Sequence, residues 1–305
     1  MRFGIDLGGT KIEILALDGS QERLRRRVAT PRGGYDETIR AMRDLVLGAE
    51  QQLGCRGTVG VAIPGTISTL TGNVKNANST NLIGHPLDKD LGSALDRGVR
   101  TANDANCFTL SEASDGAAAS DDIVFGVIVG TGCGGGIAVG RRVLGGAHGI
   151  AGEWGHNPLP APRPREIETA PRCYCGRIGC IESWISGTGL AADFRRRAGR
   201  DLPPNGIAAA AAGGDALAGA VMEDFYDRFA RALASIVNVL DPDTIVIGGG
   251  LSNIDAIYSE LPARVMQYAF TPETPSRIVR NLHGDSSGVR GAAWLWSEAE
   301  AAALK

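Results

Sequence analysis

The sequence predicts an α/β protein of two lobes with a cleft between them. Short apolar runs typical of strands alternate along the chain with longer segments that have the apolar spacing of amphipathic helices. A unit of strand, glycine-rich turn and strand occurs twice, about half a chain apart, which indicates an internal duplication with one hairpin in each half. The length of 305 residues suits two domains of ordinary size.

The first half begins with the first hairpin, in which apolar residues 3–7 and 12–17 flank a turn at residues 8–11. Residues 36–53 follow with apolar side chains at helical spacing, and residues 59–63 form another apolar run. The predicted order of this half is therefore hairpin, helix and strand.

In the second half the opening hairpin recurs. Apolar residues 123–129 and 136–139 flank a glycine turn, and a long helical pattern at 216–240 precedes an apolar strand at 244–247. The remaining expected segments are a strand at 99–102, helices at 105–119, 253–270 and 288–303, and a proline-rich loop at 158–171.

Composition excludes several classes of protein. Hydrophobic residues make up 43% and charged residues 21% of the chain, and the formal net charge is -3, which is typical of a globular protein. The basic runs 25–27 and 195–197 are interpreted as solvated faces, so no nucleic-acid surface is expected. No secretory leader or membrane span is evident, and Cys55, Cys107 and Cys133 are scattered, so we expect a reducing cytoplasm.

A metal site is predicted between residues 156 and 180. His156, Cys173, Cys175 and Cys180 supply one imidazole and three thiolates, the ligand set of a closed tetrahedral zinc site that leaves no position for a reacting water. The spacing of the first two cysteines is shorter than in a zinc finger, so a chance or redox cluster is the alternative.

The two carboxylates next to this cluster are expected to bind a polar ligand. Glu153 precedes His156 in the sequence, and Glu182 follows Cys180. Because a closed zinc organises its loop and does no chemistry of its own, the metal would serve to hold these side chains still.

The first glycine hairpin is a candidate phosphate-binding site. Gly8 and Gly9 have no side chain, so backbone N–H groups in this turn can approach phosphate oxygens. Thr10 can add a hydroxyl group and Lys11 a positive charge. Asp6, on the strand behind the turn, suits a magnesium ion held through water. The alternative is a tight turn that needs glycine for its backbone angles.

The second hairpin, residues 130–136, is richer still in glycine and is assigned the same role. Residues 248–250 follow an apolar strand and would let an adenine or ribose lie on the backbone at the start of the next helix. Glycine that ends a strand for packing reasons is the alternative at this position.

Asn103 and Asp104 lie where a strand ends and a helix begins. One interpretation makes Asp104 the N-cap of that helix, since aspartate is among the best residues there. The other makes it a general base that accepts the proton of a substrate hydroxyl, kept ionised by the helix N-terminus.

Together these motifs resemble the ROK family of bacterial sugar kinases and repressors over essentially the whole chain. The segments that carry the resemblance are Gly4-Ile-Asp-Leu-Gly-Gly-Thr-Lys11, Gly60-Val-Ala-Ile-Pro-Gly65, Ala102-Asn-Asp-Ala-Asn-Cys107, Gly130-Thr-Gly132, Gly152-Glu-Trp-Gly-His156 and the cysteine segment 173–182. Within the family the chain is most similar to bacterial fructokinases that also accept mannose, through segments 74–80, 156–160 and 283–296. One departure is the longer stretch between His156 and Cys173, which leaves any ligand contact of Glu166 or Glu168 open.

The resemblance implies an actin-like, ribonuclease-H-like fold of two lobes, and ATP-dependent phosphorylation of a sugar hydroxyl with Asp104 as the catalytic base. Sugar contacts are implied for Gly65, Asn78, Asn103, Asp104, Glu153, His156 and Glu182. ATP contacts are implied for Gly4, Ile5, Asp6, Leu7, Gly8, Gly9, Thr10, Lys11, Gly130, Thr131, Gly132, Cys133, Gly134, Gly249 and Gly250. The implied zinc ligands are His156, Cys173, Cys175 and Cys180, and Asp6 is implied to hold magnesium through water.

The two lobes are expected at residues 1–116, with a C-terminal helix near 290–305 packed back on them, and at residues 117–289, with the zinc site. The expected partners are ATP and a hexose, without nucleic acid or membrane, in a cytoplasmic homodimer.

D-Fructose is the expected main acceptor, which would give fructose 6-phosphate. Mannose, glucose or an N-acetylated hexosamine is the alternative, because sequence motifs do not resolve the orientation of one hydroxyl. A sugar-responsive repressor of the same family is the remote rival. Since only five residues precede Asp6, no helix-turn-helix domain is expected ahead of it.

Overall fold

The computed structural model describes residues 1–77, 79–272 and 276–303, and the chain divides into two compact units. The first comprises Met1–Ser120, Gly136–Ala151 and Asp285–Lys305, and the second comprises Asp121–Gly135 and Gly152–Gly284. The sequence analysis ends the first lobe at residue 116 and assigns residues 136–151 to the second lobe, whereas here both 117–120 and 136–151 group with the first unit.

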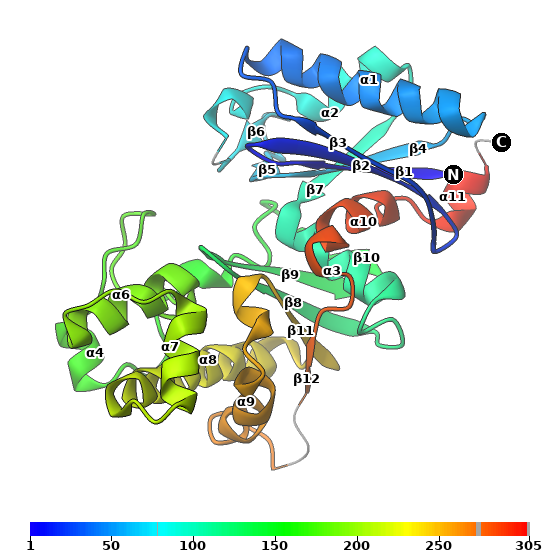
Figure 1. The fold of residues 1–305 in the computed structure, drawn as a ribbon. Helices are drawn as coiled ribbons and strands as arrows, with labels where there is room; N and C mark the ends of the chain where they lie inside the picture. Colours follow the sequence, from blue (N-terminus) through cyan, green and yellow to red (C-terminus); the bar gives the residue numbers. More distant parts are fainter. Residues whose placement is uncertain (78, 273–275, 304–305) are drawn as a thin grey trace. The chain divides into compact units, whose positions relative to one another are not determined.

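The first unit is organised around a five-stranded sheet. Its strands in spatial order are β3 (Gln21–Ala29), β2 (Lys11–Asp18), β1 (Arg2–Leu7), β4 (Thr58–Ile63) and β7 (Val99–Asn103). The pairs β1–β2 and β2–β3 are antiparallel, whereas β1–β4 and β4–β7 are parallel. Figure 1 shows two helices on each side of this sheet: α1 (Tyr35–Leu53) and α2 (Leu87–Leu95) on one, α3 (Asp104–Asp115) and α10 (Ser287–Trp294) on the other.

Glycines let α10, from the end of the chain, approach this sheet closely. A Cβ added at Gly4 of β1 would lie 2.0 Å from a backbone carbonyl oxygen of α10, and one added at Gly60 of β4 would lie 1.9 Å from another. A Cβ at Gly291 of α10 would lie 1.6 Å from the carbonyl oxygen of Cys107 on α3. Backbone therefore packs directly on backbone here, which only glycine allows.

The second sheet repeats the plan of the first. Its strands in spatial order are β10 (Arg142–Val143), β9 (Cys133–Val139), β8 (Ile123–Val129), β11 (Thr244–Gly248) and β12 (Arg277–Arg280). Each sheet thus consists of an antiparallel edge formed by its first three strands and a parallel edge formed by its last two. This shared strand order confirms the internal duplication that the two hairpins predict.

The helices of the second unit fall mostly between β10 and β11. They are α4 (Pro164–Glu168), α5 (Glu182–Ile185), α6 (Gly187–Ala198), α7 (Pro204–Ala212) and α8 (Ala216–Leu240), followed by α9 (Ala256–Met266) between β11 and β12. Shorter elements of the described chain are β5 (Thr66–Ile67), β6 (Val74–Lys75), α11 (Glu298–Ala302) and the 3₁₀ turns Thr80–Leu82, Trp154–His156, Gly250–Asn253 and Gly284–Ser286.

The longest helices and both hairpins were predicted correctly, whereas α2, α6 and α7 were not predicted, although Leu87, Leu91 and Leu95 of α2 have helical spacing. The helices at 36–53 and 216–240 and both hairpins are confirmed. The helix expected at 288–303 is instead two helices, α10 and α11. Strand β3 was missed because only Leu24 of it is buried, so its sequence has no apolar alternation.

The loop predicted at residues 158–171 contains the short helix α4, so that prediction is wrong in part. Pro164 stands in the first turn, where its missing N–H leaves no hydrogen bond unmade. Glu166 Oε2 accepts a hydrogen bond from the N–H of Arg163 at 2.8 Å, which closes the start of the helix. Proline and charge therefore begin this helix rather than prevent it.

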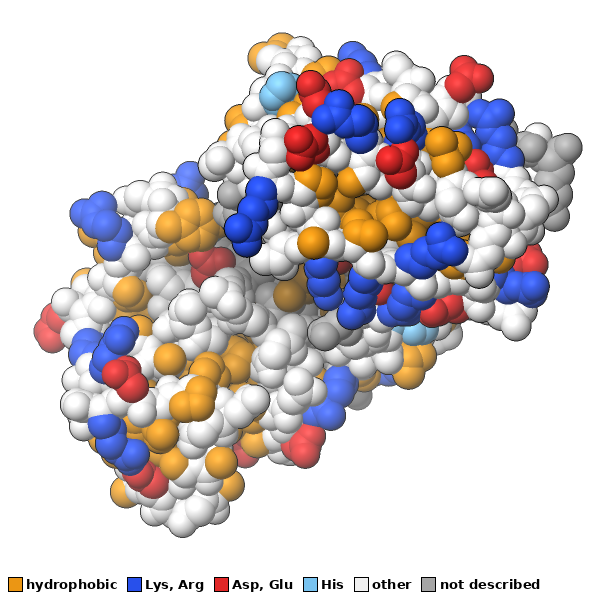
Figure 2. All heavy atoms as spheres, turned by 45° about the horizontal axis from the view of Figure 1, so that its top comes forward, with side chains coloured by type: hydrophobic (Ala, Val, Ile, Leu, Met, Phe, Trp, Pro, Cys, Tyr) orange, Lys and Arg blue, Asp and Glu red, His pale blue; other side chains and the backbone are white. Residues whose placement is uncertain are grey.

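Within the described residues, no helix has both the length and the apolar character needed to cross a bilayer. Figure 2 shows basic and acidic side chains close to one another over the face it presents. Ion pairs among the described residues include Arg25 with Glu22 at 2.6 Å.

Candidate functional site

Two carboxylates of the first unit, near the end of β1 and at the start of α3, lie close enough for Asp104 to affect the ionisation of Asp6. Asp6 is on β1, and Asp104 is the first residue of α3, directly after β7. The N-cap of α3 is Asn103, whose Oδ1 accepts a hydrogen bond from the N–H of Ala105 at 2.9 Å. The interpretation of Asp104 as the N-cap is therefore wrong, and its side chain is exposed to solvent.

The surroundings of these carboxylates disfavour negative charge. Burial, the nearby Asp104 and Glu13 together raise the pKa of Asp6 from 3.8 to about 6. The protein groups packed around the Asp104 carboxyl displace part of its water and raise its pKa, although the side chain stays accessible from one side; the hydrogen bond from Ala105 acts in the opposite direction. Neighbouring carboxylates that repel each other fit a divalent cation, which would relieve their repulsion, so these residues are suited to magnesium.

Glu13 explains part of this effect. It is paired with Asp6 across β1 and β2, and its side chain is buried. Arg25 and Arg27 bind Glu13 at 3.2 and 2.8 Å. These arginines, interpreted from the sequence as a solvated face, therefore neutralise a buried carboxylate behind the candidate site.

The turn after β4 is tied to the same strand ends. Asn103 Nδ2 donates a hydrogen bond to the carbonyl oxygen of Gly65 at 3.2 Å. Gly65 has φ of 78°, and a Cβ there would lie 2.3 Å from the carbonyl oxygen of Lys75, so glycine is required on both counts. Asn78, the other expected sugar contact of this segment, lies outside the described residues.

The tip of the first hairpin is open. Neither Gly8 nor Gly9 has a positive φ, and a Cβ on Gly9 would meet nothing closer than 3.8 Å. The alternative that this turn needs glycine for its backbone angles is thus wrong. Among the described residues, the N–H groups of Gly9 and Thr10 have no hydrogen-bond partner, so both can be offered to an anion.

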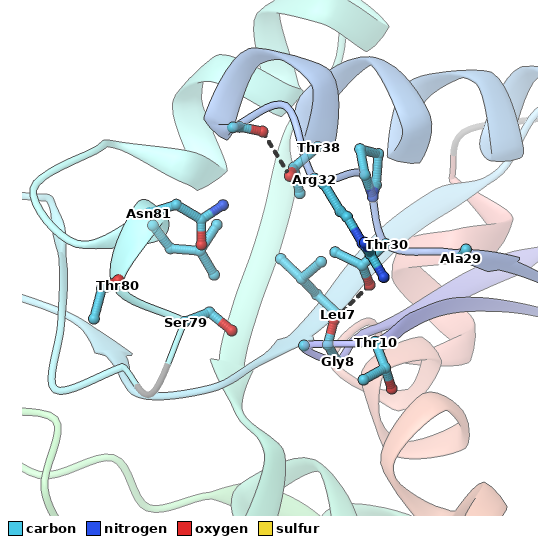
Figure 3. A pocket seen from close by; sticks show the side chains of 14 residues that line it. Leu7, Gly8, Thr10, Ala29, Thr30, Arg32, Thr38, Ser79, Thr80 and Asn81 are labelled. Carbon is cyan, nitrogen blue, oxygen red and sulfur yellow. Dashed lines mark hydrogen bonds between the residues drawn. The ribbon is translucent and has the colours of Figure 1, made fainter.

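A cavity of about 590 Å³ adjoins this tip (Figure 3). Figure 3 shows Arg32 and Thr38 on the α1 side and Ser79 opposite them, with Gly8 and Thr10 below. Leu7 lines this cavity, so Asp6, which precedes it on the strand, points to the opposite face of the sheet.

The second hairpin lies against two other candidate segments of its unit. The N–H of Cys133 donates to Oε2 of Glu182 at 2.9 Å, and a Cβ at Gly132 would lie 2.8 Å from the same oxygen. Gly249, with φ of 81°, packs on Val129, where a Cβ would come within 2.5 Å of the carbonyl oxygen. Gly249 is therefore explained by packing, whereas Gly250 has open space where a Cβ would point.

The four residues predicted to bind zinc converge. The candidate ligand atoms of His156, Cys173, Cys175 and Cys180 all lie within 4.8 Å of one another. His156 Nδ1 is 3.6 Å from the Cys173 sulfur, and the Cys175 and Cys180 sulfurs are 3.6 Å apart. Ligands about 2.1–2.3 Å from a central ion at tetrahedral angles would be separated by similar distances. The donor set and its spacing therefore fit a closed zinc site.

Tyr174, between two of the zinc ligands, contacts the histidine. Its hydroxyl lies 3.0 Å from Nε2 of His156, so it can orient the ring whose other nitrogen faces the thiols. Burial, followed by the charges of Glu182 and Glu153, raises the pKa of Tyr174 to about 12. The two carboxylates expected at the sugar are thus close to the same tyrosine.

Glu166, whose role was left open, is a structural residue. It is buried and binds the guanidinium groups of Arg228 and Arg231 at 2.8 and 2.7 Å. This ion-pair group ties α4 to α8. Glu168 is exposed and lies outside these pairs.

The structure thus brings the predicted residues together within each unit. Those of the first unit are the hairpin residues 4–11, Gly65, Asn103 and Asp104, and those of the second are residues 130–134, Glu153, His156, Cys173, Cys175, Cys180, Glu182, Gly249 and Gly250. Glu13 and Tyr174 were not predicted as site residues, although the place of Tyr174 between two cysteines could have revealed it. Thr188, whose hydroxyl donates to the carbonyl oxygen of Thr131 at 2.7 Å, was not predicted either, because no sequence pattern marks it.

Comparison with known proteins gives consistent results. The model of the ROK family matches residues 2–299. The N-acetyl-D-glucosamine kinase of Escherichia coli O157:H7 is 42% identical over 299 residues, which are 97% of this chain and 99% of that protein. The N-acetyl-D-glucosamine kinase of Pectobacterium atrosepticum is likewise 42% identical over 97% of this chain and 98% of its own length.

Solved structures agree with the fold. The ROK hexokinase from Thermus thermophilus matches with a TM-score of 0.85 and 31% identity, covering 96% of this chain and 97% of that one. The ROK family glucokinase from Streptomyces griseus, in complex with glucose and AMPPNP, matches with a TM-score of 0.73 and 26% identity over 96% and 97% of the two chains. The fold class predicted from the sequence is confirmed.

Proposed function

Because this chain belongs to the ROK family, we propose that it is an ATP-dependent sugar kinase whose acceptor is N-acetyl-D-glucosamine. The observation that carries the acceptor is the identity of 42% to N-acetyl-D-glucosamine kinases over nearly the whole of both chains. The sequence analysis expects fructose as the main acceptor, and these relatives do not support that choice. They favour its alternative, an N-acetylated hexosamine.

In the proposed reaction, a sugar hydroxyl attacks the γ-phosphorus of ATP. A new bond forms between that oxygen and phosphorus, the bond to the β-phosphate oxygen breaks, and ADP leaves. Asp104 takes the hydroxyl proton; its exposed side chain is available for this, and its raised pKa makes it a better base than a solvated aspartate. Asn103 holds the start of α3 and the turn at Gly65 in one arrangement.

The remaining groups bind and position. The hairpin N–H groups of Gly9, Thr10, Thr131 and Gly132 suit phosphate oxygens, and Lys11 adds a positive charge. Glu153 and Glu182 are proposed to accept hydrogen bonds from sugar hydroxyls, which discriminates against analogues that lack one. Magnesium held near Asp6 would neutralise phosphate charge, and zinc on the cysteine cluster would supply no chemistry beyond fixing its loop.

A coupled assay of ADP release tests both parts of the proposal. We expect kcat/KM for N-acetyl-D-glucosamine to exceed those for fructose, mannose and glucose by at least about tenfold. The other three sugars lack the acetamido group, so protein groups that hydrogen-bond to it would be left without a partner when one of them binds. A higher kcat/KM for fructose would overturn the acceptor and leave the kinase standing. No sugar-dependent ADP release with any of the four would overturn the kinase itself.

A further inference from the structure

The second glycine hairpin is held by the start of α6, a few residues after the last zinc ligand. The N–H of Gly187, the first residue of α6, donates to the carbonyl oxygen of Gly130 at 2.7 Å. The hydroxyl of Thr188, the next residue, donates to the carbonyl oxygen of Thr131 at 2.7 Å. Two successive carbonyl groups of the hairpin are thus bound by two successive residues of the helix.

This contact also provides a hydrogen-bond acceptor for an N–H group at the start of α6. The first N–H groups of a helix have no partner inside it, and the Gly130 carbonyl supplies one. A Cβ at Gly187 would lie 2.8 Å from that carbonyl oxygen, so the approach depends on glycine. Ser186, the N-cap, accepts from the N–H of Gly189 at 3.0 Å and lies 3.0 Å from the Thr188 hydroxyl. The Thr188 side chain is therefore fixed from both sides.

Fixing these carbonyls also fixes the direction of the N–H groups. In a planar trans peptide, the C=O of one residue and the N–H of the next point in opposite directions. With the Gly130 and Thr131 carbonyls turned toward α6, the N–H groups of Thr131 and Gly132 point away from it. Neither N–H has a hydrogen-bond partner in the described part of the chain. Two adjacent free N–H groups form a ready anion-binding concavity.

We propose that Thr188 is a positioning residue for nucleotide binding: by holding the Thr131 carbonyl, it aims the Gly132 N–H at a phosphate oxygen. This inference rests on the proposed function, since it takes the hairpin as the phosphate site. Thr188 acts through the backbone and does not itself touch the phosphate. Its side chain is exposed, so its contribution to folding is small.

The test replaces Thr188 by valine, which keeps the shape and removes the hydroxyl. Binding of a non-hydrolysable ATP analogue with magnesium is measured by calorimetry, and KM is measured separately for ATP and for N-acetyl-D-glucosamine. For Thr188→Val we expect a Kd and an ATP KM raised about 3- to 10-fold, the effect of one lost hydrogen bond. The sugar KM should stay within twofold, and Thr188→Ser should restore nucleotide affinity.

Thr169→Val is the matched control, because the Thr169 hydroxyl also donates to a backbone carbonyl, that of Arg165 at 2.8 Å, on an exposed turn elsewhere in the unit. It should leave nucleotide affinity unchanged. Equal affinity of wild type and Thr188→Val, or a serine variant as weak as the valine variant, would overturn the inference. A wild-type protein that binds no nucleotide would overturn the proposed function and this inference with it.

A second readout does not depend on turnover. Hydrogen exchange of the Thr131 and Gly132 amides should slow when the ATP analogue binds wild type. In Thr188→Val at saturating analogue, the Gly132 amide should keep less of this protection. Full protection in the variant would contradict the assigned role.

Discussion

The two halves of this chain share a strand order but support their glycine hairpins in different ways. In the first unit the Gly8 carbonyl oxygen accepts a hydrogen bond from the hydroxyl of Thr30 at 2.7 Å, and Thr30 directly follows β3. In the second, the Thr131 carbonyl accepts the hydroxyl of Thr188, from an inserted helix. Each hairpin therefore has a threonine that fixes one carbonyl and so directs the following N–H.

The larger difference is in charge. Asp6 lies two residues before Gly8, the first glycine of its turn, and the equivalent position, two residues before Gly130, is Ile128. The first unit also carries Asp104, whereas the second adds the candidate metal cluster of one histidine and three cysteines and several helices between β10 and β11. On the proposed function, both turns would bind phosphate oxygens, and the cation and proton chemistry would belong to the first unit alone.

Replacing Asp104 by asparagine tests most directly whether the proposed proton transfer belongs to the first unit. Asparagine keeps the size of the side chain but cannot take a proton, so we expect kcat to fall about 10²- to 10⁴-fold. The KM for sugar should change little, because hydrogen bonding is retained. Asp122→Asn, an exposed carboxylate of the second unit, should have no effect. Turnover of Asp104→Asn within threefold of wild type would remove Asp104 from the reaction.

Loss of the metal tests what the inserted segment contributes. Cys180→Ser should abolish stoichiometric zinc, measured by elemental analysis, because metal binding and local folding are coupled. The segment up to α6 should loosen, so we expect kcat/KM to fall at least about 10- to 100-fold. Hydrogen exchange should quicken in the second hairpin and stay unchanged in the first.

Cys55→Ser is the control, since Cys55 lies in the first unit, outside the cluster. It should retain zinc, activity and the exchange pattern. A wild-type protein that is active and free of zinc would refute the site, whatever the variant does.

The hairpins and the metal cluster could be predicted from local sequence, whereas the contacts that hold them in place could not. The four side chains that converge as a candidate metal site could be predicted because histidine and cysteine restrict the chemistry by residue type, and both hairpins because glycine between apolar runs is a local pattern. Asn103, rather than Asp104, caps α3 because a one-residue shift of a helix start depends on tertiary contacts such as that to Gly65. Thr188 meets Thr131 only in the folded chain, so no spacing reveals it.

Because the neighbouring carboxylates Asp6 and Asp104 belong to the first unit, we expect the stability of that unit to depend on pH. The pKa of Asp6 is raised from 3.8 to about 6, chiefly by burial and then by Asp104. A carboxyl raised in this way adds stability below its unfolded pKa and loses it as pH rises through the folded value. Without magnesium, wild type should therefore lose about 1–3 kcal/mol of unfolding free energy between about pH 4 and pH 7 relative to Asp6→Asn.

Denaturant unfolding at a series of pH values measures this difference. Asp18→Asn, an exposed carboxylate on the neighbouring strand, should follow the wild-type curve. Magnesium should stabilise wild type near pH 7 and leave Asp6→Asn unaffected. If the unfolding free energies of wild type and Asp6→Asn changed with pH in parallel, the pKa of Asp6 would not be raised in the folded protein, and the prediction would be wrong.

The smallest expected effect comes from Thr30, and it tests whether Thr30 and Thr188 support nucleotide binding in the same way. Thr30→Val removes the hydroxyl that holds the Gly8 carbonyl, and we expect the Kd for an ATP analogue to rise about 2- to 10-fold, with recovery in Thr30→Ser. Similar losses for Thr30→Val and Thr188→Val would mean that both turns bind phosphate with comparably directed N–H groups. If only Thr188→Val weakens binding, the first hairpin does not use its Gly9 N–H, and its role reduces to placing Asp6 and Lys11. The structure favours the first outcome, because the N–H groups that follow both anchored carbonyls are unpartnered among the described residues.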